Sequence, residues 1–327
     1  MKYINISVFL FILFAISITG CEGKKNHSFS GNAFGTIYYI NIIDNYDNDI
    51  SEIKYNIDEI IYNIDNSASN YNKNSEISVF NLSTTTSYKL ISSNLYNIIS
   101  KANKISNLTN GYFDITVGDI KIKKGFYLNT QKVIKGKSRN FNYNDVVLSD
   151  KKRSIKKNKK NINIDLSGIA KGYAVDLIYN YLLSININNF FINIGGEIKV
   201  HNSEDPVKVV IDDPSKNKQY VEEIFLQNKS IATSGTYNNT SNYKGKEISH
   251  IVNPKTLKNI DNLNLLVSVI HDECASADAL ATGLIAMDPK DIISFSNANN
   301  IASMLILISE NKLEKQYSNE FIKYLTE

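Results

Sequence analysis

The order of apolar and polar positions predicts a strand followed by an amphipathic helix near the start of the folded chain. Residues 35–43, GTIYYINII, are rich in β-branched and aromatic residues, which is typical of a strand. Residues 49–69 then carry isoleucines at the spacing of one helical face, with acidic and polar residues between them: Ile53, Ile57, Ile60, Ile61 and Ile64.

Two more helices and a hairpin are predicted further along. Residues 95–108 have helical spacing and run into TNGY, where Gly111 can take the left-handed conformation that ends a helix. Residues 172–183 predict a third helix. In residues 145–165 two β-prone runs flank a lysine-rich stretch. This pattern favours a solvated hairpin with lysines along its edges over a patch that binds nucleic acid or anionic lipid.

Strand-like segments dominate the second half of the chain, and no internal repeat or long low-complexity linker separates them. They are NFFINIGGEIKV, VKVVIDD, EEIFLQNKSIATSG, ISHIV, NLLVSVI and ASMLILIS. The sequence therefore predicts one α+β domain over residues 31–327, with mostly antiparallel or mixed sheets packed against helices.

The charge balance and the cysteines exclude several classes of function. Lys and Arg number 36 against 33 Asp and Glu, a net charge of +3, so no global field favours nucleic acid as a partner. Cys274 is the only cysteine after Cys21, so the folded part can form neither an intrachain disulfide nor a thiolate metal site. We expect Cys274 to be a small buried residue.

The first twenty residues predict a signal peptide. Lys2 precedes an apolar stretch, residues 8–18, that is too short to span a bilayer comfortably. The stretch ends in ITGC, which resembles a bacterial lipobox, although a plain secretory signal with an incidental cysteine is the alternative. We expect a lipid on Cys21, a polar tether over residues 21–30, and a membrane-anchored protein facing the periplasm or the cell exterior.

Two motifs in the middle of the chain place charge in unusual surroundings. TNGYFDITVG, residues 109–118, sets Asp114 within an apolar, strand-like run, where a buried carboxylate needs a partner. IDLSGIAKGYAVD, residues 164–176, is expected to pass from a strand into a helix through small residues. Asp165 and Lys171 would lie near that turn, which can hold phosphates although it differs from the Walker pattern.

Three later motifs offer weaker signals. In NIGGEI the glycines Gly195 and Gly196 indicate either close approach of a ligand to a strand or a bulge. ATSGTY contributes Ser234, and SHIVNP contributes His250, although a lone histidine is more often structural than catalytic.

The apolar run CASADALATGL, residues 274–284, carries two polar side chains one helical turn apart, Asp278 and Thr282. Their oxygens could meet at one point and would suit Mg²⁺ or Ca²⁺. Alternatively, Asp278 caps the helix and Thr282 bonds a carbonyl of the preceding turn.

Taken in this order, the motifs resemble the ApbE family of bacterial flavin transferases, which move FMN from FAD onto a threonine or serine of a target protein. The resemblance runs from AFGT, residues 33–36, to ADALATGL, residues 277–284, and includes NSASNYNKNSEISVFN. It implies Mg²⁺ bound by Asp278, Thr282 and the backbone carbonyl of Gly168, and His250 as a base or proton shuttle. It also implies FAD contacts at Phe34, Tyr71, Tyr112, Phe113, Asp114, Asp165, Lys171 and Val252.

The chain departs from the family pattern at four positions. Phe34 stands where the family usually has Met, and Ala281 stands where some relatives carry an additional acid. Asn253 replaces an Asp, and Leu257 replaces the usual Gly, so the geometry of the loop after His250 is in question.

The resemblance implies an Mg²⁺-dependent FAD:protein FMN transferase that releases AMP. Its partner would be an acceptor flavoprotein, such as a subunit of a membrane redox complex. Two alternatives stay open: an FAD pyrophosphatase that uses water as the nucleophile, and a lipid-anchored FAD-binding protein without catalysis.

Overall fold

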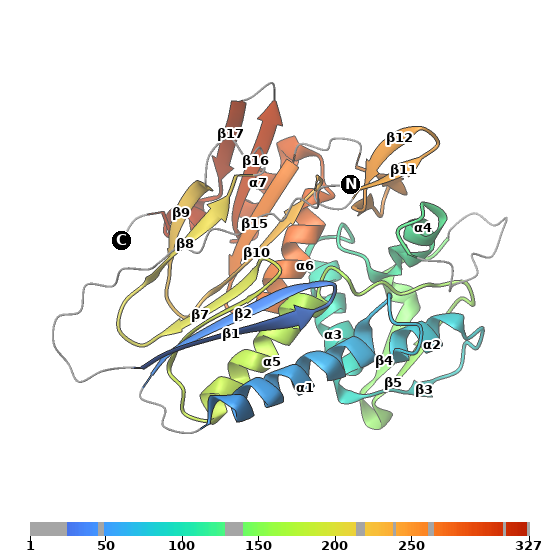
Figure 1. Ribbon diagram of the computed structural model, residues 1–327. Coiled ribbons are helices and arrows are strands. Elements are labelled where there is room, and N and C mark those ends of the chain that lie inside the picture. The colour runs from blue at the N-terminus through green and yellow to red at the C-terminus, as the bar shows by residue number, and fades with distance from the viewer. Residues whose placement is uncertain are drawn as a thin grey trace, which may run out of the picture.

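An eight-stranded antiparallel sheet forms the frame of the protein (Figure 1). The computed structural model describes residues 25–44, 49–127, 140–213, 220–237, 240–260, 265–309 and 312–325. In spatial order the sheet consists of β1 (Lys25–Ala33), β2 (Thr36–Asp44), β6 (Asn189–Ile194), β7 (Glu197–Asn202), β10 (Ser230–Gly235), β15 (Leu265–His271), β16 (Ala302–Ser309) and β17 (Lys312–Tyr317).

Both faces of the central strands are covered. Neighbouring residues of β10 point to opposite sides, so Ala232 joins the main core while Ile231 joins a second apolar cluster. The main core lies under α1 (Ile50–Ala68), α3 (Ser93–Leu108), α5 (Ala170–Ser184) and α6 (Cys274–Ile285). The second cluster is closed by the hairpin of β8 (Val207–Asp212) and β9 (Tyr220–Leu226) and by α8 (Asn319–Ile322).

Smaller elements complete the domain. α7 (Pro289–Ala298) precedes β16, and three strands form a separate small sheet in the order β3 (Lys89–Leu90), β5 (Ser154–Lys157) and β4 (Val146–Ser149). Two short hairpins pair β11 (Thr240–Tyr243) with β12 (Lys246–Ser249) and β13 (Val252–Asn253) with β14 (Lys258–Asn259). The remaining helices are α2 (Glu76–Leu82) and α4 (Gly118–Lys123), with single 3₁₀ turns η1 (Ile115–Val117), η2 (Tyr143–Asp145) and η3 (Asp150–Lys152).

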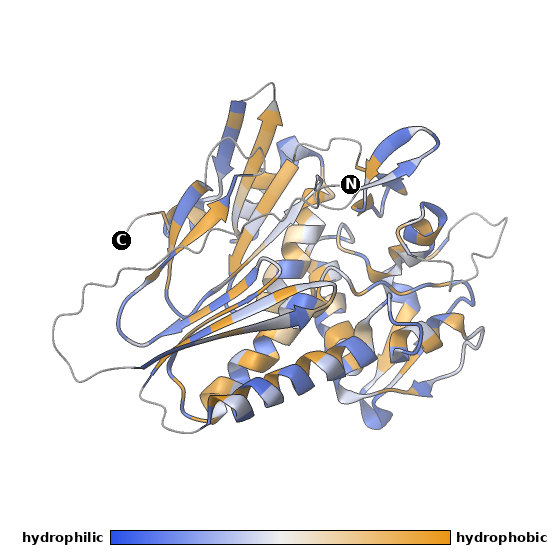
Figure 2. Ribbon diagram, in the orientation of Figure 1, coloured by the Kyte–Doolittle hydropathy of each residue, from blue (hydrophilic) through white to orange (hydrophobic). Residues whose placement is uncertain are grey.

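The predicted fold class is confirmed, and so are the main predicted elements. The first strand and the three helices appear as β2, α1, α3 and α5. A hairpin also forms in the predicted region, but its second strand, β5, lies within the lysine-rich stretch and not in the β-prone run that follows it. α1 has one apolar and one polar face, whereas the edge strand β17 is largely hydrophilic (Figure 2). Gly111 adopts a φ of 78° after α3, as predicted. In the described part of the chain, no helix is both long and apolar enough to cross a membrane.

One lysine of the predicted solvated hairpin is buried. The Lys157 ammonium donates hydrogen bonds to the backbone carbonyls of Asn81 at 3.1 Å, Ile162 at 3.2 Å and Phe80 at 3.4 Å. Burial lowers its pKa to about 8. This lysine ties α2 to the chain after the hairpin instead of facing solvent.

The predicted tether is wrong over residues 25–30, because these residues belong to β1. The strand pairs with β2 along its whole length, from Lys25 opposite Asp44 to Ala33 opposite Thr36. Backbone pairing at a sheet edge requires little apolar burial, so polar composition concealed the strand. Cys21 and the predicted signal peptide lie outside the described residues.

Three predicted strand segments are also wrong. The run after Asp114 turns into η1 and α4 because the Asp114 carboxylate caps the backbone there. Gly195 and Gly196, with φ of 62° and 104°, form the tight turn between β6 and β7 and are neither within a strand nor a bulge. Residues 162–166 belong to no strand.

Candidate functional site

Two helices at the centre of the site cap each other. Asp278, within α6, accepts a hydrogen bond from the Gly172 backbone amide in the first turn of α5 at 3.2 Å. Asp176 of α5 accepts from the amides of Cys274 at 2.7 Å and Ala275 at 3.0 Å at the start of α6. These carboxylates satisfy amides that each helix leaves unpaired. The alternative in which Asp278 caps its own helix is therefore wrong.

A glycine allows this close crossing of α5 and α6. A Cβ atom at Gly172 would clash with the Cys274 carbonyl and would lie 2.8 Å from the Ala275 Cα. Cys274 is a free, buried cysteine, as predicted. The small residues of the α6 motif thus bring Asp278 to the N-terminus of α5.

The three predicted metal positions lie where α6 meets the loop before α5. The Thr282 side chain packs against Gly168, because a Cβ atom on that glycine would lie only 2.8 Å from Thr282 Oγ1. Thr282 Oγ1 is also 3.3 Å from Ser234 Oγ at the end of β10. The Thr282 hydroxyl thus forms a hydrogen bond with Ser234. The alternative, a hydrogen bond to a carbonyl of the preceding turn of α6, is therefore wrong.

These oxygen donors fit Mg²⁺. The described residues contain no cluster of three or more His, Cys, Asp or Glu side chains able to hold a metal. One buried carboxylate, one hydroxyl and one backbone carbonyl form a hard donor set that Mg²⁺ accepts when water or substrate phosphate supplies the remaining ligands. Asp278 is only 4% exposed, and burial raises its pKa, which the nearby Lys171 charge opposes.

Lys171 forms an ion pair with an acid that the sequence did not indicate. Its Nζ lies 2.6 Å from Oε1 of Glu197, the first residue of β7. Burial raises the Glu197 pKa to about 7, against the opposing effect of Lys171. Burial alone would lower the pKa of Lys171, but the carboxylates of Glu197 and Asp278 raise it. The signal available in the sequence was an acid directly after a double-glycine turn.

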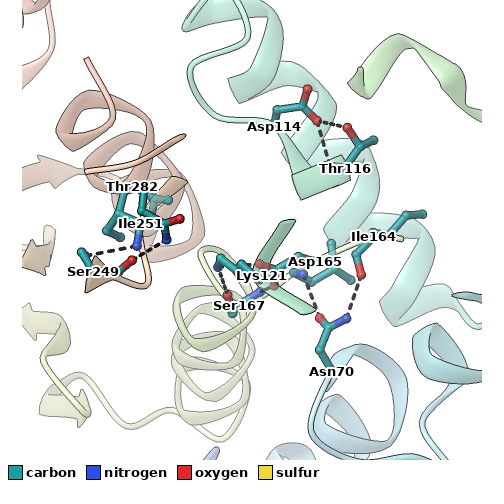
Figure 3. A network of polar contacts seen from close by, with 12 residues as sticks. Asn70, Asp114, Thr116, Lys121, Ile164, Asp165, Ser167, Ser249, Ile251 and Thr282 are labelled. Carbon is teal, nitrogen blue, oxygen red and sulfur yellow. Dashed lines mark hydrogen bonds and ion pairs between the residues drawn. The ribbon is translucent and has the colours of Figure 1, made fainter. Parts of the chain in front are cut away.

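Two asparagines hold the segment that carries Asp165, and Figure 3 shows one of them, Asn70. Asn81 Oδ1 accepts from the Ile164 amide and its Nδ2 donates to the Ile164 carbonyl, both at 2.8 Å. Asn70 Nδ2 donates to the same carbonyl at 2.7 Å, and its Oδ1 accepts from the Leu166 amide at 3.1 Å. Side chains here replace the neighbouring strand that the sequence pattern led us to expect.

Asp165 is the centre of a buried polar network. Its carboxylate lies 2.5 Å from Lys121 Nζ, which also donates to Ser167 Oγ at 3.0 Å, and it accepts from the Ser167 amide at 2.9 Å (Figure 3). Burial alone would raise the Asp165 pKa. The Lys121 charge, these hydrogen bonds and a hydrogen bond with the Tyr127 hydroxyl together lower it. Asp165 therefore remains ionised. Sequence patterns pointed to neither Lys121 nor Tyr127.

The predicted aromatic contacts differ in exposure. Tyr71 is 63% exposed, and its ring lies edge-on to Tyr127 with the centroids 5.1 Å apart. Tyr112 is partly buried beneath the ammonium of Lys255, which is 4.1 Å from the ring centroid. Phe113, in contrast, is 4% exposed and packs against Gly283 of α6. Tyr71 and Tyr112 can therefore meet a ligand, whereas Phe113 supports the wall of the site.

The acid in the predicted Asp114 motif finds its partners locally. Asp114 Oδ1 accepts from both the amide and the hydroxyl of Thr116 at 2.7 Å, and Oδ2 accepts from the Tyr143 amide at 3.3 Å (Figure 3). The carboxylate is 6% exposed. Hydrogen bonds to backbone and hydroxyl groups thus meet the expected need for a partner.

The loop that carries His250 contacts α4 and the C-terminal end of α6. Ser249 Oγ accepts from the Ile251 amide at 3.2 Å, and Val252 packs with the apolar residues Val117 and Ile120. His250 itself is partly buried. Val252 therefore lies against α4, and Asn253, the next residue, contacts the C-terminal end of α6.

The two departures in this loop have structural consequences. Asn253 donates from Nδ2 to the Ala286 carbonyl at 2.8 Å, a bond that an aspartate could not make, while its Oδ1 accepts from the Lys255 amide at 2.9 Å. Leu257 has a φ of 58°. The loop therefore keeps the backbone conformation that a glycine adopts without strain.

The turns of two hairpins of the large sheet, β1–β2 and β6–β7, also border the site. Phe34 and Gly35, with φ of 52° and 77°, form the turn between β1 and β2. Thr36, which follows this turn, leaves no room for a side chain at Gly195 in the turn between β6 and β7. The two tips are therefore neighbours, and Phe34 lies at the strand end that also bears Glu197.

Comparisons with known proteins agree with this architecture. The ApbE family profile matches residues 34–305. An FAD:protein FMN transferase from Vibrio cholerae is 30% identical over 94% of this chain and 96% of its own. One from Buchnera aphidicola (subspecies Schizaphis graminum) is 31% identical over 97% and 96%. The solved flavin transferase ApbE of Vibrio cholerae superposes with a TM-score of 0.79 at 27% identity, covering 92% of this chain and 99% of that one.

The fold and the site define a single α+β domain of the architecture found in solved flavin transferases. The profile match over most of the chain, together with relatives similar along almost their full length, shows that the protein belongs to the ApbE family.

Proposed function

We propose that this protein is an FAD:protein FMN transferase that attaches FMN to a threonine or serine of an acceptor flavoprotein and releases AMP. Two contacts at the α5–α6 crossing carry the proposal, that of Asp278 with the Gly172 amide and that of Thr282 with Gly168, in a chain whose curated relatives bear that name. A hard-cation site beside a turn rich in backbone amides suits a pyrophosphate substrate.

The residues of the site divide the work by their chemistry. Mg²⁺, held by Asp278, Thr282 and the Gly168 carbonyl, would supply positive charge to the pyrophosphate. Tyr71 and Tyr112 present accessible rings on which flat adenine or isoalloxazine groups can lie. The other proposed FAD contacts border the site around the α5–α6 crossing: Phe34, Asp114, Asp165, Lys171 and Val252. Phe113 is buried and supports the wall of this site.

His250 is the proposed base for the acceptor hydroxyl. Its loop contacts the C-terminal end of α6, the helix that carries Thr282, and an imidazole can take a proton near neutral pH. The acceptor oxygen would bond to the phosphorus on the FMN side, the phosphoanhydride bond would break, and AMP would leave with the electron pair. His250→Ala should therefore lower the rate of transfer with little change in FAD affinity.

Release of AMP from FAD separates transfer from hydrolysis. The proposal predicts that purified protein with FAD and Mg²⁺ releases AMP in proportion to added acceptor. Rapid AMP release without acceptor would instead establish the pyrophosphatase alternative. FAD binding with no AMP release under either condition would establish the non-catalytic alternative.

We also propose that the protein is a lipoprotein anchored through Cys21, with the domain facing the periplasm or the cell exterior. The support is the lipobox-like ITGC after an apolar leader. Mass spectrometry of the mature N-terminus tests this proposal. An acylated N-terminal Cys21 is expected, and an intact leader or an unmodified cysteine would contradict it.

A further inference from the structure

Lys171 lies near two buried carboxylates but forms an ion pair with only one of them. Its Nζ is 2.6 Å from Glu197 Oε1. The Asp278 carboxylate raises the Lys171 pKa by its charge alone. Its hydrogen bond comes from the Gly172 amide and not from Lys171. The lysine is thus held by an acid outside the proposed set of metal ligands.

The position of Glu197 is fixed by the backbone. Glu197 follows the Gly195–Gly196 turn directly and stands opposite Ile194 in the β6–β7 register. A Cβ atom at Gly195 would come within 2.6 Å of Thr36 Cγ2, so the turn is locked against the neighbouring hairpin. The turn therefore fixes the backbone position from which the Glu197 side chain reaches Lys171.

The Glu197 carboxylate has no other protein partner in the described structure. Its side chain is 3% exposed, and Oε2 is buried without a hydrogen bond to any described group. A buried carboxylate with an unbonded oxygen is costly unless an opposite charge is paired with it. Its pairing with Lys171 supplies that charge.

We propose that Glu197 is a positioning residue that holds the Lys171 ammonium away from Asp278 and so leaves the Asp278 carboxylate available to Mg²⁺. Without the Glu197 charge, the nearest buried anion for Lys171 is Asp278. An ammonium paired with Asp278 would compete with the metal for the same oxygens. The inference rests on the magnesium site of the proposed function.

Titration of the full chain with Mg²⁺ alone tests this role without measuring catalysis. Isothermal calorimetry would compare wild type, Glu197→Gln and the double variant Glu197→Gln/Lys171→Met, with Glu59→Gln on the exposed face of α1 as the control. Loss of a residue that orients a metal ligand typically weakens metal binding by about 10- to 100-fold. We expect this loss in Glu197→Gln, near wild-type affinity in the double variant because the competing cation is gone, and no change in the control.

The outcomes separate this inference from the proposed function. Absence of Mg²⁺ binding by wild type would overturn the magnesium site and the inference with it. Wild-type affinity in Glu197→Gln would overturn the inference alone, and so would a double variant as weak as the single, because that result marks a purely structural role. If Glu197→Gln does not fold, Glu197→Asp, which keeps the charge but shortens its reach, should weaken Mg²⁺ binding and regain affinity with Lys171→Met. Failure of either effect in Glu197→Asp would overturn the inference.

Discussion

Replacement of Asn81 by alanine should destabilise the protein and loosen the segment that carries Asp165. Asn81 makes two hydrogen bonds of 2.8 Å to Ile164, one to its amide and one to its carbonyl. In the variant the Ile164 carbonyl keeps the Asn70 amide as a donor, but the Ile164 amide loses its acceptor. Asn81 and the Ile164 segment are buried, so water does not replace the lost partner easily.

The expected magnitude follows from these contacts. The lost hydrogen bond to the Ile164 carbonyl at about 1 kcal/mol and the unsatisfied buried Ile164 amide at about 1–3 kcal/mol give a loss of about 3 kcal/mol. In the double variant Asn70→Ala/Asn81→Ala the Ile164 carbonyl loses both donors. Its destabilisation should therefore exceed the sum of the two single effects by about 1 kcal/mol.

Urea unfolding measures both quantities. The free energy of unfolding should fall by about 3 kcal/mol for Asn81→Ala and change by less than about 0.5 kcal/mol for Asn63→Ala, a control on the exposed face of α1. FAD affinity should fall as well, because the same segment leads to Asp165 and Gly168. A loss below about 1 kcal/mol for Asn81→Ala, or strict additivity in the double variant, would refute the reasoning.

Three further predictions test other parts of the structure. Leu257→Gly should raise the free energy of unfolding in urea by about 1 kcal/mol, since it relieves a φ of 58°, and destabilisation would contradict the assigned strain. Gly168→Ala should displace Thr282 and abolish the rise in melting temperature on addition of Mg²⁺, whereas an unchanged rise would remove Gly168 and Thr282 from the site. Burial raises the Asp176 pKa from 3.8 to about 6, so its stabilising contribution is full below pH 3.8 and is lost as the pH rises through 6. Between pH 4 and 7 the free energy of unfolding of the wild type should decline relative to that of Asp176→Asn. Parallel curves of unfolding free energy against pH for the two proteins would contradict this prediction.

The sequence predicted elements well where apolar side chains decide the structure. The isoleucine face of α1 has a clear helical period, and the central strands β15 and β16 are nearly continuous apolar runs. Prediction from the sequence failed where polar groups, and not apolar burial, determine the structure. β1 is held by backbone pairing at an edge, and residues 162–166 are held by Asn81 of α2 and by Asn70 in the connection between α1 and α2. No local pattern marks such long-range partners.

The candidate site shows the same division. Asp278 and Thr282 could be found because their spacing on one apolar helix is unusual, and the structure adds that Asp278 also caps α5. Glu197 and Lys121 could not be found, because each is defined by the partner that the fold brings to it, Lys171 in one case and Asp165 in the other. A charged residue's role depends on contacts that sequence spacing does not encode.

Intact-mass spectrometry of an acceptor flavoprotein shows whether the protein transfers FMN covalently. After incubation with the protein, FAD and Mg²⁺, the acceptor should gain the mass of one FMN, with one AMP released for each acceptor modified. Asp278→Ala or removal of Mg²⁺ with a chelator should abolish the gain. An acceptor of unchanged mass while wild type releases AMP, or a full gain with Asp278→Ala, would contradict the account.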